Sequence, residues 1–213
     1  MSLQYIINSA VSIEVNRSKL VAQSISRSGK VLTSSRNWVN PWRFVVEPQP
    51  VWLHANYRSI FEPIINGDKY IEHTIKLGQG GQAWVTEYQG NCPTTNGVLN
   101  TLTVTSATGT NMVVNTTGLT TGQVIVKAGD VIQPVGHRYP YVATETVIVS
   151  GSSATIPLHR GFIPTATSIS GVGLRVGTSC EFTVQVTKMP TTKFTTGKLV
   201  EFTSNFDLIE VVL

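Results

Sequence analysis

The stretch Leu99-Asn-Thr-Leu-Thr-Val-Thr105 alternates apolar residues with small polar residues, the period of a β-strand with one buried face. It lies within residues 90–180, a block rich in Thr, Gly and Val. The block holds few of the chain's charges, namely Lys127, Asp130, Arg138, Glu145, Arg160 and Arg175. We therefore expect residues 90–180 to form an inserted β domain, carried by a discontinuous host domain made of residues 1–89 and 181–213.

Turn signals divide the insert into short segments of strand character. The predicted strands are 123–126, 131–135, 141–149 and 154–158, of which 141–149 is the longest run. Such regular spacing indicates a small β-barrel or β-sandwich and leaves the choice between them open. The predicted fold class of the chain is mainly β.

The host also reads as strands, together with one helix. Residues 11–15 alternate cleanly, with residues 20–25 as the expected hairpin partner, and further strands are expected at 41–47, 69–77, 182–187, 198–202 and 207–213. From Val51 the period becomes helical and places Leu53, Tyr57, Ile60, Phe61 and Ile64 on one face. Pro50 suits the first turn of this helix, and Pro63 should end or kink it. The host is thus an expected antiparallel sandwich or barrel with one flanking helix.

Residues 26–40 form a polar segment that reads either as a long hairpin or as a projecting arm. Arg27, Lys30 and Arg36 lie there among Ser and Gly residues, a composition that does not pack well alone. If it is an arm, an adjacent subunit should order it and protect it from proteases.

Composition excludes several classes of function. The 213 residues carry a net charge of +4 without a basic run, so nonspecific nucleic-acid binding is a weak hypothesis. The first residues lack the pattern of a signal peptide, and no run of about 18 apolar residues suggests a membrane span. A soluble protein made in a cytoplasm is expected.

The sequence contains no recognisable catalytic, cofactor-binding or metal-binding motif. His54, His73, His137 and His159 are not clustered with acidic residues or cysteines at ligand spacing. No phosphate-binding loop and no nucleophile elbow occurs, and three aspartates leave little for an acid–base pair. We therefore predict no catalytic residue, no cofactor and no metal, and a protein that is not an enzyme.

Cys92 and Cys180 lie at the two ends of the insert, so we expect them to be close in space, while two cysteines make no disulfide framework. Trp38, Trp42 and Trp52 cluster near Pro41 and the helix. They could stack on a sugar, or they could be core and subunit-contact residues.

Several short motifs resemble a β-module inserted in structural tail proteins of tailed bacteriophages. They are Lys127-Ala-Gly-Asp-Val-Ile-Gln133, Tyr139-Pro-Tyr-Val-Ala-Thr144 and Ala154-Thr-Ile-Pro-Leu-His-Arg-Gly-Phe162. The flanks resemble such proteins at Arg36-Asn-Trp-Val-Asn-Pro-Trp-Arg-Phe44, Val186-Thr-Lys-Met-Pro190, Leu199-Val-Glu-Phe202 and Phe206-Asp-Leu-Ile-Glu210.

The resemblance implies a tail-tube-like host whose copies join edge to edge into a ring, by analogy a hexamer. Expected partners are further copies and other tail and baseplate proteins, with DNA only as cargo passing through the lumen and no membrane. The expected location is the virion tail, assembled in the host cytoplasm. Candidate subunit contacts are Arg27, Lys30, Arg36, Trp38 and Trp42. Two alternatives are a carbohydrate-binding β module that recognises a host cell surface and, less favoured, a cryptic hydrolase.

Overall fold

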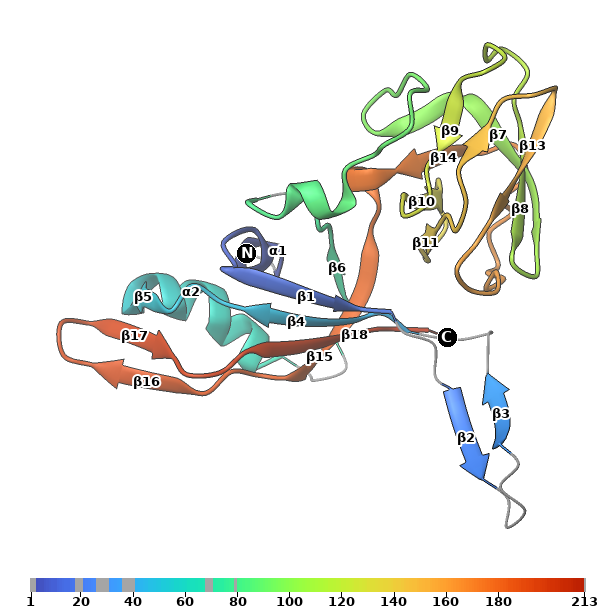
Figure 1. Ribbon diagram of the computed structural model, residues 1–213. Helices are drawn as coiled ribbons and strands as arrows, with labels where there is room; N and C mark the ends of the chain where they lie inside the picture. Colours follow the sequence, from blue (N-terminus) through green and yellow to red (C-terminus); the bar gives the residue numbers. More distant parts are fainter. Residues whose placement is uncertain are drawn as a thin grey trace.

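The computed structural model describes residues 3–17, 21–25, 31–35, 41–67, 71–78 and 80–212. The fold is mainly β with antiparallel sheets, as predicted, and Figure 1 shows the host and the insert as two separate masses of strands.

The host is built on a five-stranded antiparallel sheet with the order β1-β4-β18-β15-β6. Its strands are β1 (Ser12–Asn16), β4 (Arg43–Glu47), β18 (Phe206–Glu210), β15 (Phe182–Lys188) and β6 (His73–Ile75). The expected hairpin between residues 11–15 and 20–25 is wrong. β1 pairs with β4, because Ile13 and Val15 lie opposite Val46 and Phe44 and so extend the apolar face of the sheet. β2 (Val21–Ile25) pairs instead with β3 (Val31–Ser35).

The β2–β3 hairpin projects away from both masses of strands (Figure 1). Its position agrees with the two interpretations of residues 26–40, because β3 lies within that segment. Residues 26–30 and 36–40 lie outside the described part of the chain.

A second sheet of the host continues the first beyond a bend. It comprises β5 (Val51–Leu53), β16 (Thr192–Thr195) and β17 (Leu199–Phe202) in the order β16-β17-β5. β5 follows β4, β16 follows β15, and β17 precedes β18, each across a short connection. The order β16-β17-β5 therefore matches the order β15-β18-β4 (Figure 1). The two sheets are therefore one path of three long, bent strands. Sequence reasoning missed β16.

Two helices cover the host sheets. α2 (His54–Ile65) buries Tyr57, Ile60 and Phe61, as the helical period predicts. Leu53 belongs instead to β5 and is exposed. Pro63 lies in the last turn of α2, and the helix ends two residues later, before the expected turn at Asn66. The short helix α1 (Leu3–Asn8), which was not predicted, buries Leu3, Ile6 and Ile7.

The insert is a small closed barrel. Its main sheet has the order β11-β10-β14-β7-β8-β13, with a side pair of β9 and β12. The two edge strands meet, because Ala143 bridges to Leu158 and the N–H of His159 donates to the carbonyl of Val142. The strands are β7 (Val98–Thr108), β8 (Asn111–Asn115), β9 (Val124–Val126), β10 (Val131–Pro134), β11 (Tyr141–Val142), β12 (Val147–Ile148), β13 (Ser153–Pro157) and β14 (Gly173–Val176).

The predicted strand 141–149 is interrupted. β11 and β12 are separate, and between them the N–H of Thr144 turns to the carbonyl of Pro157 on the neighbouring strand. The longest strand is β7, at 11 residues.

Buried apolar residues form two clusters that follow the host and the insert. The insert cluster contains residues from Cys92 to Val176, and the host cluster draws on the flanking segments. Val131, Val142 and Cys180 are the exceptions, because they lie within residues 90–180 and pack with the host cluster. The two parts thus have their own cores and share a contact at β10 and β11.

The chain enters and leaves the insert along adjacent paths. A Cβ added to Gly78 would collide with the side chain of Thr178, and one added to Gly177 would stand 2.7 Å from the carbonyl oxygen of Thr86. These approaches bring η1 (Ala83–Thr86) against η2 (Gly177–Ser179). The chain enters the insert from η1, which ends two residues before Tyr88.

Candidate assembly edges and the junction cavity

One edge of the five-stranded sheet is closed by a side chain. The Oε1 atom of Gln4 accepts the N–H of Lys76 at 2.6 Å, and its Nε2 donates to the Lys76 carbonyl at 2.8 Å. A primary amide placed this way copies the two hydrogen bonds of a neighbouring strand. Helix α1 therefore caps the chain just beyond β6, which limits further pairing at this edge.

The opposite edge, formed by β1, is open in the described part of the chain. The N–H of Glu210 in β18 donates to the Trp42 carbonyl, so the backbone groups of Trp42 face β18. Because these groups alternate along a strand, those of Arg43 and of every second residue after it in β4 face β1. Ser12, Glu14 and Asn16 then point their backbone groups at β4. By the same alternation, Ile13 and Val15 point theirs outward.

β16 is a second open edge among the described strands. The N–H of Phe202 donates to the Pro50 carbonyl, so Phe202 and Val200 face β5 while Glu201 faces β16. Lys193, opposite Glu201, therefore faces β17. Thr192 and Phe194 direct their backbone N–H and C=O groups to the free side.

Exposed apolar side chains accompany both open edges. Trp84 is 72% exposed and Val11 56%, and the Gln82 amide joins their segments by donating to the Ala10 and Val11 carbonyls. Phe194, on β16, is 61% exposed. Sequence reasoning singled out neither Trp84 nor Phe194, because nothing in a strand or turn pattern tells which aromatic residue stays uncovered.

The structure describes one of the five candidate subunit contacts. Arg27, Lys30, Arg36 and Trp38 lie outside the described residues. Trp42 is 2% exposed and packs edge-on against Phe182, a core position rather than a surface one.

Trp52, at 6% exposed, is also buried, and its indole N–H donates to the carbonyl of Gln49. A sugar ring stacks only on an accessible aromatic face, so two of the three tryptophans proposed as a sugar-binding face are covered.

A buried ion pair ties the insert to the host. Nη1 and Nη2 of Arg160 donate to the two carboxylate oxygens of Glu210 at 2.5 and 2.7 Å, and both side chains are 1% exposed. Nη2 also donates to the Pro140 carbonyl at 2.9 Å, and the carboxylate accepts the N–H of Trp42. This bidentate geometry fixes the barrel against β4 and β18.

Polar contacts around Glu181 add to this junction. Gln133 of β10 accepts the N–H of Glu181 and donates to its carbonyl. The Glu181 carboxylate contacts Lys76 of the host at 3.1 Å and Arg175 of the insert at 2.6 Å. Partial burial alone would raise the pKa of Glu181, but the hydrogen bonds from Arg175 and Lys76 outweigh it and lower that pKa.

The two cysteines are free thiols in different clusters. Sγ of Cys92 contacts the carbonyl of Val124, whereas Sγ of Cys180 contacts that of Val131. Burial raises the pKa of both thiols, so both stay protonated near neutral pH.

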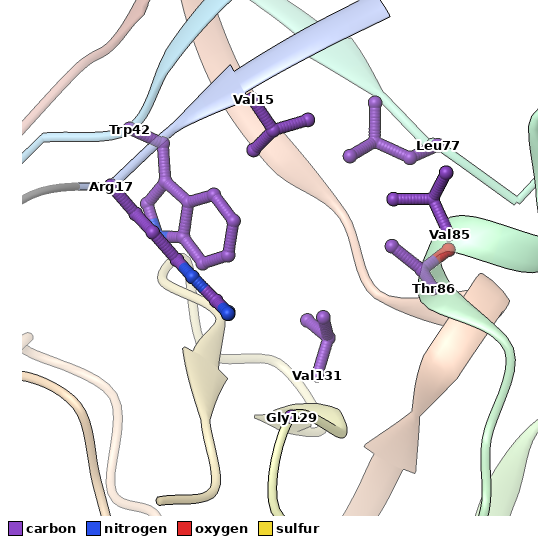
Figure 2. Close-up of a pocket in the computed structure, with 8 residues that line it drawn as sticks. All are labelled: Val15, Arg17, Trp42, Leu77, Val85, Thr86, Gly129 and Val131. Atoms are coloured by element: carbon purple, nitrogen blue, oxygen red, sulfur yellow. The ribbon is translucent and has the colours of Figure 1, made fainter.

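A cavity of about 220 Å³ lies where host and insert meet (Figure 2). Its apolar wall is made by Val15, Leu77, Val85, Val131 and the ring of Trp42. Arg17 lies along Trp42, with its guanidinium carbon 5.8 Å from the ring centroid, and extends toward Gly129. A second cavity of about 290 Å³ shares Arg17 and Gly129 with the first and reaches Thr144 and His159.

The described residues hold no group of three or more His, Cys, Asp and Glu side chains placed to bind a metal ion. Neither described helix has the length and apolar character needed to cross a bilayer. No protein-family model matches the chain, and no curated protein is significantly similar to it.

Proposed function

We propose that this chain is a structural subunit of a bacteriophage tail, which forms a ring in the tail tube or baseplate by pairing strand edges between copies. The observation that carries the proposal is the pair of open edges, β1 and β16, on opposite sides of one bent path of strands. The motifs that resemble phage tail proteins supply the biological setting.

Open strand edges are a hazard for an isolated protein, because any extended chain can pair with them. In this host, Gln4 covers the chain just beyond β6, whereas the β1 edge stays open. The two edges of the five-stranded sheet therefore differ in their availability for pairing. Pairing β16 of one copy with β1 of the next is a head-to-tail contact. Repeated head-to-tail contacts close into a ring when the rotation per copy divides a full turn.

The insert adds a rigid contact surface to each copy. The Arg160–Glu210 pair and the contacts of Glu181 hold the barrel in one orientation on the host sheet. Copies in a ring would therefore present their barrels in a regular array, where neighbouring tail proteins can bind them. DNA would pass through the lumen without specific contacts.

A proline on β16 tests the edge pairing. Thr192→Pro removes an outward N–H at the first residue of an edge strand, where proline is tolerated, and breaks no ladder bond within the chain. We expect a monomer with an unchanged circular dichroism spectrum that is no longer incorporated into tail particles. Thr192→Val, which keeps the N–H, is the matched control. Normal incorporation of Thr192→Pro would contradict pairing through this edge.

A further inference from the structure

We propose that the two adjoining cavities around Arg17 form a binding site for a carboxylate attached to a small apolar group. The inference goes beyond the assembly role, because it concerns a pocket between host and insert rather than a strand edge.

Arg17 is the charged residue that lines both cavities. No described acidic side chain forms an ion pair with it. Asp130, which lies between the lining residues Gly129 and Val131, is 3% exposed, and its carboxylate oxygens accept the backbone N–H groups of Lys127 and Gln89. Among the described residues, no carboxylate therefore competes with a ligand for the Arg17 guanidinium.

The charge at the site suits one carboxylate. Nδ1 of His159 accepts the N–H of Val142 at 3.0 Å, so this nitrogen is already used by the backbone. Arg17 is the one arginine or lysine among the described lining residues. One guanidinium matches one carboxylate in a bidentate pair, whereas a doubly charged phosphate calls for further cations.

The remainder of the ligand is set by the apolar wall. Figure 2 shows Leu77 and Val85 across the cavity from Trp42 and Arg17, with Val15 between the two sides. An aromatic or branched body would fill this space while its carboxylate meets the guanidinium. The combination of a mostly apolar pocket with one oriented polar group is the usual composition of small-ligand sites.

Benzoate is a suitable probe, with benzamide as its uncharged counterpart. In a nitrogen-15 NMR spectrum of the full chain, the indole N–H signal of Trp42 can be assigned by its loss in Trp42→Phe. We expect benzoate to shift this signal in a saturable way and benzamide to bind at least tenfold more weakly. Arg17→Gln should weaken benzoate binding at least tenfold, and Arg58→Gln, the same change on the exposed side of α2, should not.

Two sources of the carboxylate are separated by sedimentation velocity. If an Asp or Glu side chain of a second copy supplies it, benzoate and Arg17→Gln should each dissociate self-associated protein. If a free small acid supplies it, benzoate should bind without changing sedimentation. The proposal is overturned if the Trp42 signal does not saturate, or if folded Arg17→Gln binds benzoate as the unmodified chain does. Neither result bears on Thr192→Pro, so the edge-pairing proposal is judged separately.

Discussion

Arg160→Met is expected to lower the free energy of unfolding by about 3–5 kcal/mol, because it leaves the Glu210 carboxylate buried without its partner. Chemical denaturation followed by tryptophan fluorescence measures the change. The effect should be among the largest of any single polar substitution, since both members of the pair are 1% exposed.

The double variant Arg160→Met with Glu210→Leu separates charge burial from packing. With both charges of this buried pair removed, most of the lost stability should return. Lys193→Gln, which breaks the exposed Lys193–Glu201 pair, is the matched control and should cost no more than about 1 kcal/mol. A loss below about 1 kcal/mol in Arg160→Met would mean that the ion pair does not hold the insert on the host.

Replacing residues 90–180 with a short Gly/Ser linker should leave a folded host that still contains α2. The host cluster is made almost entirely of host residues, and the chain crosses at adjacent points, so a short linker can close the gap. The shortened host should nevertheless be less stable, because the host side chains that Val131, Val142 and Cys180 cover become exposed to water.

Circular dichroism and thermal unfolding of the shortened host test this expectation. The complementary control is the insert made alone as residues 87–181, which should fold as a barrel. An insoluble or unstructured host, with a barrel that also fails to fold, would show one continuous domain and end the two-core description.

The sequence predicted the mainly β class and most strand positions, because period-2 alternation is visible at β1, β4, β13 and β15. It also predicted the buried face of α2, because the apolar residues there recur with the period of a helix. Which strands pair with each other was harder to predict. Residues 20–25 follow β1 closely, yet β1 pairs with β4, since the partner is decided by Ile13 and Val15 meeting the apolar face across the sheet.

The junction could not be predicted from local pattern. Arg160 and Glu210 are 50 residues apart, and nothing near either shows that both are buried. Arg17 likewise gains its setting from Trp42 and from the turn at Gly129, which belongs to the other mass of strands. Such sites depend on the packing of two cores, which is a long-range property of the fold.

The measurement that tests the central proposal most directly is electron microscopy of phage particles that contain this chain. We expect a tail ring with six copies per layer, in which β16 of each copy pairs with β1 of the next. A layer of three or twelve copies, or a ring whose copies leave both edges uncovered, would contradict it.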